Sequence, residues 1–316
     1  MQTRQLRDLT VSALGLGCMG MSTVYGRPDK QEATATLNTA LDEGVTFFDT
    51  AESYGNGHNE TFLGQRLAHR DDITIATKFG ITTNRLSLPT GQDGRPENCR
   101  RAVHGSLQRL RRDHIDLYYL HRPDPKVPIE ESVAEMSKLV DEGLVRYIGV
   151  SEVTAAQLRA ADEVHPVTAL QSEWSVFSRD IEDGPVQEAR RRGIGVVAYS
   201  PLSRGLLSAD RGSTTNLPLL DYRRALPRWK RSNLTKNLNE ITAIQEVAER
   251  HGATVAQISL AWVLARGQDV VPIPGTKRRT RLLENIGSLA VDLSAEDIAV
   301  LDRVRASGGR YSGMPD

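Results

Sequence analysis

A tyrosine in a polar loop is the first residue of this sequence that suggests chemistry. The stretch FFDTAESYGNGHNE, residues 47–60, reads as a buried strand that ends near Asp49 and continues into a loop around Tyr54. The Gly, Asn and His residues of this stretch favour a turn, where an aromatic hydroxyl has no core to fill. We therefore expect Tyr54 to act on a molecule outside the core.

Three further ionisable residues, Asp49, Lys78 and His121, stand where apolar runs end. Each alone has an ordinary explanation, such as a cap, a solvated charge or a structural hydrogen bond, but their recurrence at run ends favours a shared site. A tyrosine titrates near pH ~10, and a neighbouring ammonium would lower its pKa. Asp49 would hold Lys78 charged, and His121 could orient a carbonyl or share the proton. Together the four residues could protonate a carbonyl oxygen while another group delivers hydride.

The chain as a whole indicates a scaffold that would bring these residues together. Eight short apolar runs alternate with helical periodicity, which predicts an α/β fold, a (β/α)8 TIM barrel whose chemistry lies at the carboxyl ends of its strands. We expect a single domain over residues 1–316 with long βα loops. It would begin with a hairpin over 4–14 that turns at Arg7-Asp8, and it would carry a long insert at 201–240. The predicted strands are 13–18, 45–50, 73–79, 115–121, 145–151, 167–173, 194–200 and 269–275.

Three of the intervening segments carry helix signals. Residues 27–44 and 132–143 each end at a glycine suited to a C-cap, and Thr154 is suited to cap the helix that follows it. A doubly wound sheet is the alternative fold. The stretch GLGCMG, residues 15–20, has glycines at the GxGxxG spacing, but loop-like residues follow it, so we disfavour a dinucleotide fingerprint there.

Composition excludes several partners. The chain has 40 acidic and 40 basic residues, so no overall charge favours nucleic acid or a membrane surface. We find no apolar run long enough to span a membrane and no apolar leader, and we expect a cytoplasmic protein. Cys18 and Cys99 cannot form a disulfide framework, and no Cys/His spacing predicts a metal site.

Seven motifs, in order, resemble the signatures of the aldo-keto reductase family. They are DTAESYGNGHNE, ATKFG, LYYLHRPD, GVSE, LQSEWS, AYSPLSRGLL and IPGTKRRTRLLENI, and they span residues 10–290. LGLGCMGMS and DYRRALPRWKRSNLTKNL further resemble the branch of pyridoxal-reductase-like and perakine-reductase-like enzymes. The resemblance implies an NADPH-dependent reductase of aldehydes or ketones, built on a TIM barrel without a Rossmann domain.

The resemblance also implies a role for each matched residue. Tyr54 would donate the proton, Lys78 and Asp49 would tune it, and His121 would place the carbonyl oxygen. Glu152 departs from the pattern, because many relatives carry asparagine there and an ionised carboxylate cannot donate a hydrogen bond to the nicotinamide carboxamide. The cofactor residues would be Ser151 and Gln171 at the carboxamide, Tyr199 stacked on the nicotinamide, Ser200, Pro201, Leu202, Arg204 and Gly205 around the pyrophosphate, and Gly275, Thr276, Lys277, Arg281, Glu284 and Asn285 at the adenosine and its 2′-phosphate.

The cations of GTKRRTR, residues 275–281, favour NADPH over NADH, because guanidinium groups pair with a 2′-phosphate. A solvated basic face is the alternative explanation. We expect the substrate, a small carbonyl compound, to be selected by residues 21–26, 223–233 and 308–316. Trp229 could instead pack the insert onto the barrel. The aromatic residues that would line this pocket, and favour apolar or ring-bearing carbonyls, are Tyr25, Trp174, Phe177, Trp229 and Tyr311.

Two other functions remain open at this point. Some proteins that resemble aldo-keto reductases serve as cofactor-sensing regulatory subunits of ion channels, and the intact quartet argues only against a purely structural role. A lyase that uses Lys78 as a Schiff base would leave Tyr54 and Tyr199 without a function.

Overall fold

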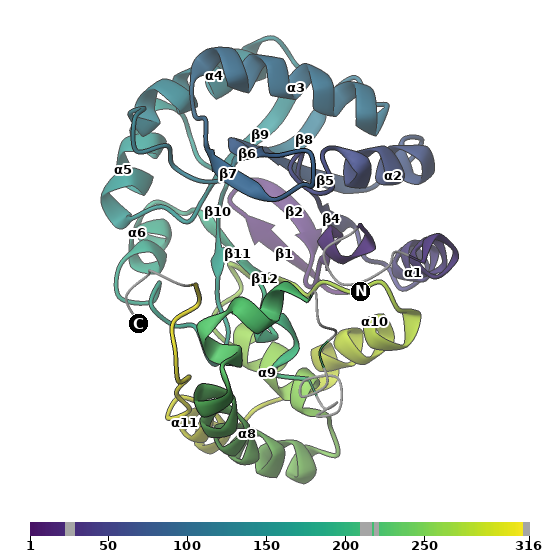
Figure 1. The fold of residues 1–316 in the computed structure, drawn as a ribbon, viewed down its shortest axis with the longest axis vertical. Helices are drawn as coiled ribbons and strands as arrows, with labels where there is room; N and C mark the ends of the chain where they lie inside the picture. Colours follow the sequence, from purple (N-terminus) through teal and green to yellow (C-terminus); the bar gives the residue numbers. More distant parts are fainter. Residues whose placement is uncertain (23–28, 209–216, 218–220, 312–316) are drawn as a thin grey trace.

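The structure is a computed structural model that describes residues 1–22, 29–208, 217 and 221–311. Eight parallel strands form one sheet inside a ring of helices (Figure 1). A parallel bridge between Gly17 and Gly275 connects the first strand to the end of the last and closes the barrel. The (β/α)8 prediction is confirmed, and the doubly wound alternative is wrong. The strands are β3 (Leu16–Gly17), β4 (Phe47–Asp49), β5 (Thr74–Phe79), β8 (Ile115–Leu120), β9 (Val145–Ser151), β10 (Ala169–Glu173), β11 (Gly195–Tyr199) and β12 (Val270–Ile273).

The glycines of GLGCMG are explained by the closure of the barrel. A Cβ atom on Gly17 would lie 2.9 Å from the backbone oxygen of Ile273, and one on Gly15 would lie 2.7 Å from Cδ1 of Phe47. The N–H of Gly15 donates to the oxygen of Pro272 at 3.0 Å. These residues therefore let β3 approach β12 and β4 closely, and a resemblance to a dinucleotide fingerprint is not needed to account for them.

The helices up to Leu264 lie between successive strands, the last two follow β12, and together they cover the outside of the barrel (Figure 1). The three predicted helix ends are confirmed: Gly44 follows α1 with φ 79°, Gly143 follows α4 with φ 74°, and Thr154 forms a capping box at α5. The helices are α1 (Lys30–Asp42), α2 (His58–Leu67), α3 (Pro96–Leu110), α4 (Ile129–Asp141), α5 (Ala155–Val164), α6 (Pro185–Arg191), α8 (Arg231–His251), α9 (Val255–Leu264), α10 (Arg279–Ile286) and α11 (Ala295–Leu301). None of these described helices is long and apolar enough to cross a membrane.

The predicted N-terminal hairpin closes one end of the barrel. Strands β1 (Thr3–Leu6) and β2 (Leu9–Ser12) pair antiparallel, and Arg7 takes the left-handed turn conformation with φ 52°. The hairpin lies across the centre of the ring in Figure 1. Leu6, Leu9 and Val11 are buried in one cluster with apolar residues from the inside of the barrel. The hairpin therefore fills the end of the barrel opposite the site.

Two segments differ from the expectation of a plain loop. The predicted insert at 201–240 includes the first half of α8, because Leu234, Leu238 and Ile241 recur at helical spacing and pack on the core. A second hairpin, formed by β6 (Ile81–Thr83) and β7 (Pro89–Gln92), follows β5 and was not predicted. It lies at the carboxyl end of β5, so it belongs to the rim of the site.

Candidate active site

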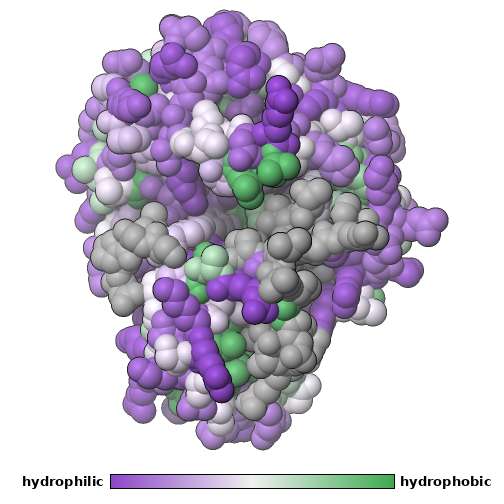
Figure 2. All heavy atoms as spheres, in the orientation of Figure 1, coloured by the Kyte–Doolittle hydropathy of each residue, from purple (hydrophilic) through white to green (hydrophobic). Residues whose placement is uncertain are grey.

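The predicted quartet meets at the carboxyl ends of β4, β5 and β8. The Lys78 Nζ lies 2.5 Å from Asp49 Oδ1, 2.6 Å from the backbone oxygen of Thr50 and 3.4 Å from Tyr54 Oη. The rings of Tyr54 and His121 are 5.9 Å apart and nearly perpendicular. This face of the molecule is hollowed near its centre (Figure 2). The geometry therefore supports one shared site, as the sequence predicts.

The loop that carries Tyr54 is held by its own backbone. The backbone N–H of Tyr54 donates to the backbone oxygen of Ala51 at 3.1 Å, and the backbone oxygen of Tyr54 accepts from the N–H of Asn59 at 3.2 Å. Gly55, Asn56 and Gly57 then adopt left-handed conformations, with φ between 51° and 85°. Glycine and asparagine tolerate this region best, which is why the polar stretch turns here and starts α2.

Asn59, which the sequence analysis missed, ties this loop to the barrel. Its Nδ2 donates to the backbone oxygen of Cys18 at 2.8 Å and to Ser22 Oγ at 2.9 Å, and its Oδ1 accepts from Thr50 Oγ1 at 2.7 Å. Thr50 is the residue whose backbone oxygen accepts from Lys78. Asn59 therefore positions the tyrosine loop and the lysine through shared neighbours. Its place inside the quoted motif DTAESYGNGHNE was the available signal.

Lys78 and Asp49 form a buried ion pair. Their side chains are 0% and 4% exposed, and Gln171 Nε2 donates to the second carboxylate oxygen of Asp49 at 2.8 Å. Burial lowers the pKa of Lys78, and burial raises the pKa of Asp49. The charge of each partner opposes the shift of the other. The short contact and the additional hydrogen bonds to each partner favour the charged pair.

The expectation of a lowered pKa for Tyr54 is wrong for this structure, although Lys78 lies 3.4 Å from its hydroxyl. Burial, followed by the charge of Asp49, raises the pKa of Tyr54 well above its usual value, and only the charge of Arg122 among the main contributions acts in the other direction. The physical reason is that removal from water penalises the phenolate, and the charge of Asp49 adds to that penalty. Tyr54 is therefore held as a protonated phenol.

His121 is held neutral. Burial, and then the charges of Lys78 and Arg122, lower the pKa of His121 well below its usual value. Its Nδ1 has no hydrogen-bond partner among the described residues. A neutral imidazole has one N–H to donate and one nitrogen to accept, so His121 can donate to a carbonyl oxygen near Tyr54. The donor is whichever ring nitrogen of His121 carries the proton.

The residues predicted for the nicotinamide lie on the neighbouring strands β9, β10 and β11, where Gln171 of β10 is level with Ser151. Ser151 is the last residue of β9 and is buried, and Tyr199 is the last of β11 and is partly exposed. Arg122, at the end of β8, joins them by donating to Ser151 Oγ at 3.3 Å and Tyr199 Oη at 3.2 Å. Gln171 adds a contact to Asp49 that was not predicted. Ser151, Gln171 and Tyr199 therefore lie along one edge of the site.

Glu152 faces the C-terminal tail. It adopts a left-handed conformation with φ 55°, and its carboxylate accepts from the N–H of Glu173 at 2.9 Å. Arg310 donates to both of its carboxylate oxygens, at 3.2 and 3.3 Å. The carboxylate that stands in place of the usual asparagine therefore has a counter-ion within this chain.

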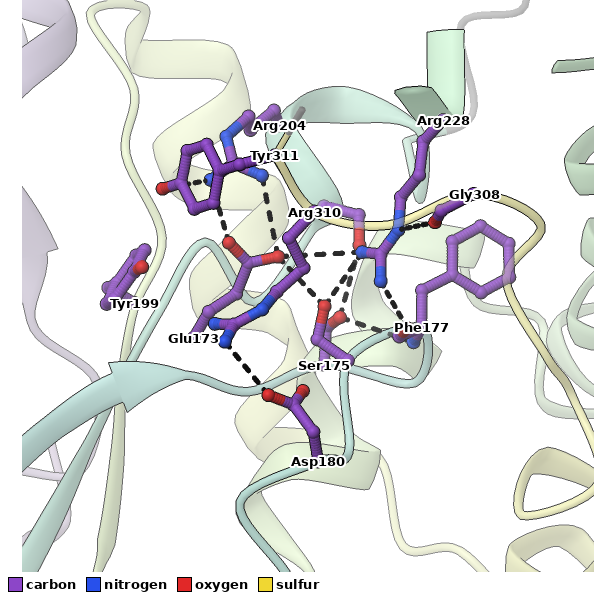
Figure 3. Close-up of polar contacts among 12 residues, drawn as sticks. Glu173, Ser175, Phe177, Asp180, Tyr199, Arg204, Arg228, Gly308, Arg310 and Tyr311 are labelled. Carbon is purple, nitrogen blue, oxygen red and sulfur yellow. Dashed lines mark hydrogen bonds and ion pairs between the residues drawn. The ribbon is translucent and has the colours of Figure 1, made fainter. Parts of the chain in front are cut away.

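The segment predicted for the pyrophosphate is strongly curved. Ser200, Ser203, Arg204 and Gly205 all have φ between 47° and 99°. The Arg204 guanidinium donates to Glu173 at 2.7 Å and to Tyr311 Oη at 2.6 Å (Figure 3). The backbone of this segment follows β11 at the rim of the site, while its arginine joins β10 to the tail. Pro201 and Leu202 lie within the same turn.

A buried carboxylate organises the tail. Glu173 is fully buried and accepts from Ser178 Oγ at 2.8 Å, with a guanidinium nitrogen of Arg228 at 3.5 Å. Arg228 also donates to the backbone oxygens of Phe177, at 2.8 Å, and Gly308, at 3.2 Å (Figure 3). Residues 308–311 are thereby fastened beside the ends of β9, β10 and β11. The sequence analysis did not identify Glu173, although it follows Gln171 in the motif LQSEWS.

The residues predicted for the adenosine end lie just before α10 and along it. Gly275 forms the barrel-closing bridge, Thr276 Oγ1 accepts from the N–H of Arg278 at 3.1 Å, and Asn285 is buried. Burial, and then the charge of Arg278, lower the pKa of Lys277. Arg281 pairs with Glu284 at 2.7 Å. The concentration of cations before and within the first turn of α10 suits a phosphate group.

The aromatic residues predicted for the substrate pocket divide into two sets. Trp174 and Phe177 are buried in the core, and Trp174 Nε1 donates to Glu182 at 2.9 Å. Trp229 is buried in the same cluster, which favours the packing role that the sequence left open for it. Tyr311 is partly exposed beside Arg204. Tyr25 lies outside the described residues. The described residues hold no cluster of His, Cys, Asp or Glu side chains that could bind a metal.

Comparisons with known proteins agree with this geometry. A sequence model of the Aldo/keto reductase family matches residues 13–306. The chain is 46% identical over 309 residues to a protein named probable aldo-keto reductase 1 of Glycine max, covering 95% of this chain and 88% of that one. A glycerol dehydrogenase from Gluconobacter oxydans is similar in structure, with a TM-score of 0.87, 31% identity and coverage of 96% and 94%. The holo form of an aldo-keto reductase from Bacillus halodurans is similar with a TM-score of 0.79, 28% identity and coverage of 99% of both chains.

Proposed function

This chain belongs to the aldo/keto reductase family and is therefore an oxidoreductase, and we propose that it reduces an aldehyde or ketone with NADPH, with Tyr54 as the proton donor. The observation that supports the proposal most directly is the contact between Tyr54 Oη and the buried Lys78–Asp49 pair, beside a neutral His121. A protonated phenol next to a cation and a neutral imidazole suits protonation of a carbonyl oxygen.

The proposed reaction balances one hydride and one proton. A bound reduced nicotinamide would supply the hydride that adds to the carbonyl carbon. Tyr54 would transfer its phenolic proton to the carbonyl oxygen, which gives the alcohol, and the resulting phenolate would regain a proton from solvent. His121 would donate its N–H to the same oxygen and hold it within reach of Tyr54. The raised pKa of Tyr54 keeps the proton on the phenol until transfer.

Lys78 would act when the phenolate forms. Its ammonium lies 3.4 Å from the Tyr54 hydroxyl, so it would stabilise negative charge on that oxygen more than it stabilises the neutral phenol. An interaction that is stronger in the transition state than in the ground state accelerates the step. Asp49 and the backbone oxygen of Thr50 would fix the direction of the ammonium.

The cofactor would lie along the ends of β9 to β12. Members of the family generally use NAD(P)H, and the cations around Lys277 and Arg281 support NADPH over NADH. Ser151, Gln171 and Tyr199 would meet the nicotinamide, since Ser151 and Tyr199 end their strands and Gln171 contacts Asp49 of the quartet. We also propose that the chain belongs to the branch of pyridoxal-reductase-like and perakine-reductase-like enzymes, that its natural partner is a carbonyl compound, and that it lies in the cytoplasm. The two cysteines, both free and buried, support a reducing compartment.

The test is turnover by the purified protein with NADPH and a panel of aldehydes and ketones, followed by loss of the NADPH absorbance. We expect many turnovers per protein molecule with at least one carbonyl compound, and none without it. The opposite result is a protein that binds NADPH but oxidises no more than one NADPH per protein molecule, whichever carbonyl compound is offered. That result would overturn the proposal in favour of a cofactor-sensing subunit.

A further inference from the structure

Arg122 is a partly buried guanidinium in the site for which the quartet leaves no role. It follows His121 at the end of β8. Nη1 donates to the backbone oxygen of His121 at 3.0 Å and to Ser151 Oγ at 3.3 Å, and Nη2 donates to Tyr199 Oη at 3.2 Å. A guanidinium has more N–H groups than these contacts use. The N–H of Nε and one N–H of Nη2 have no acceptor in the part of the chain that the structure describes.

The charge of Arg122 has no counter-ion within the described ranges of the chain. All its partners are neutral oxygens, and it forms no ion pair with any described residue. The nearby carboxylates are committed to other cations: Glu152 to Arg310 at 3.2 Å, and Glu173 to Arg204 at 2.7 Å (Figure 3). An oxyanion that reaches the unused N–H groups would add charge-assisted hydrogen bonds, which the neutral partners of Arg122 do not supply.

The unused N–H groups of Arg122 are placed to meet a substrate. Arg122 adjoins His121, whose ring lies 5.9 Å from that of Tyr54. Burial dominates the pKa shifts of Tyr54 and His121, and the charge of Arg122 lowers the pKa of each, which reflects its closeness to both. The phosphates of the proposed cofactor are expected further along the rim, at 200–205 and 275–285. Arg122 is partly exposed, so part of its side chain can be reached from solvent.

We propose that Arg122 binds an oxyanion on the carbonyl substrate, so that the site prefers aldehydes or ketones that carry a carboxylate or phosphate group. This inference rests on the proposed reductase function and adds a substrate class to it. Guanidinium recognises both oxyanions through paired hydrogen bonds. The expectation of a ring-bearing substrate is compatible with it, because an aromatic aldehyde can carry the anion on its ring.

The test compares the specificity constants, kcat/KM, for substrates that differ in charge and little in shape. The value measured with 4-carboxybenzaldehyde is divided by the value with methyl 4-formylbenzoate, and 4-formylphenyl phosphate is likewise compared with 4-methoxybenzaldehyde. We expect the wild-type ratio to exceed one for at least one pair, and Arg122→Met to lower that ratio about 10- to 100-fold, the range of a charge-assisted hydrogen bond. Arg122→Lys keeps the charge and should give an intermediate ratio. The control, Arg146→Met, changes an exposed arginine at the other end of the barrel and should leave the ratio unchanged.

A binding measurement separates this inference from the proposed function. The affinities of 4-(hydroxymethyl)benzoate and of its methyl ester are measured by calorimetry in the presence of NADPH, because an alcohol and the reduced cofactor cannot react with each other. We expect Arg122→Met to weaken only the carboxylate. Equal loss for both compounds, or an unchanged ratio, would overturn the inference while leaving reduction intact. Carboxylate binding that depends on Arg122, without turnover of any aldehyde, would instead contradict the proposed function alone.

Discussion

Lys78→Met should reveal the cost of an unpaired charge in the barrel. The side chains of Lys78 and Asp49 are 0% and 4% exposed, so solvent does not screen the pair. Breaking a buried pair by removing one partner costs about 3–5 kcal/mol, because the remaining charge stays buried. The variant also leaves the backbone oxygen of Thr50 without the lysine donor. We therefore expect the free energy of unfolding at neutral pH to fall by about 3–5 kcal/mol.

Removing the second charge should restore part of this loss. In Lys78→Met/Asp49→Asn the carboxylate is gone, and the asparagine oxygen can still accept from Gln171. The double variant should therefore be more stable than Lys78→Met alone at neutral pH. The assay is urea unfolding of both variants, with Lys138→Met as control, because Lys138 is 65% exposed in its pair with Glu135 and should change stability little.

The difference in the free energy of unfolding between Lys78→Met/Asp49→Asn and Lys78→Met, called the gap below, should depend on pH. Burial raises the pKa of Asp49, and Lys78, the largest opposing influence, is absent from Lys78→Met. An unfolded aspartate titrates near pH ~3.9. A carboxyl group whose folded pKa is raised contributes full stability below its unfolded pKa and loses it as pH rises through the folded value. The gap should be small near pH ~4 and widen as pH rises. A Lys78→Met variant as stable as Lys138→Met at neutral pH, or a gap that narrows as pH rises, would refute the reasoning.

Two other predictions concern the cofactor and the tail. Changing Lys277 and Arg281 to alanine should weaken NADPH binding by about 10-fold or more and leave NADH binding nearly unchanged, since only NADPH carries the 2′-phosphate; a wild-type protein with equal affinity for both in a fluorescence titration would contradict this. Deleting residues 308–316 removes the contacts of Arg310 and Tyr311, and should change the relative kcat/KM values among carbonyl substrates more than the NADPH affinity. Unchanged relative values would show that the tail is not part of the pocket.

The sequence predicts the barrel because its signals are local and repeated. Most of the eight strands are short apolar runs, and parallel strands covered on both faces favour that composition. The same holds for the quartet, since Asp49, Lys78 and His121 each interrupt or follow such a run with an ionisable side chain. Strand ends meet in a barrel regardless of their distance in the chain, so position at a strand end was sufficient to place these residues together.

The remainder depends on contacts between distant segments. Arg204, identified in sequence as a cofactor residue, also joins Glu173 to Tyr311, which is 107 positions further along the chain. Glu152 departs from the family pattern, and its counter-ion, Arg310, is 158 positions further along the chain. The pKa of Tyr54 was assigned the wrong direction because burial outweighs a nearby charge, and the extent of burial is not visible in a list of residue types.

The central claim is that Tyr54 donates the proton, and Tyr54→Phe tests it most directly. The substitution removes the hydroxyl that lies 3.4 Å from Lys78 and keeps the ring beside His121. The measurement is the single-turnover rate of aldehyde reduction by wild type and variant, with NADPH affinity determined on the same samples. Loss of a positioned acid should slow the step by about 10²- to 10⁴-fold while NADPH still binds. A variant that binds NADPH and reduces the aldehyde at close to the wild-type rate would contradict the mechanism.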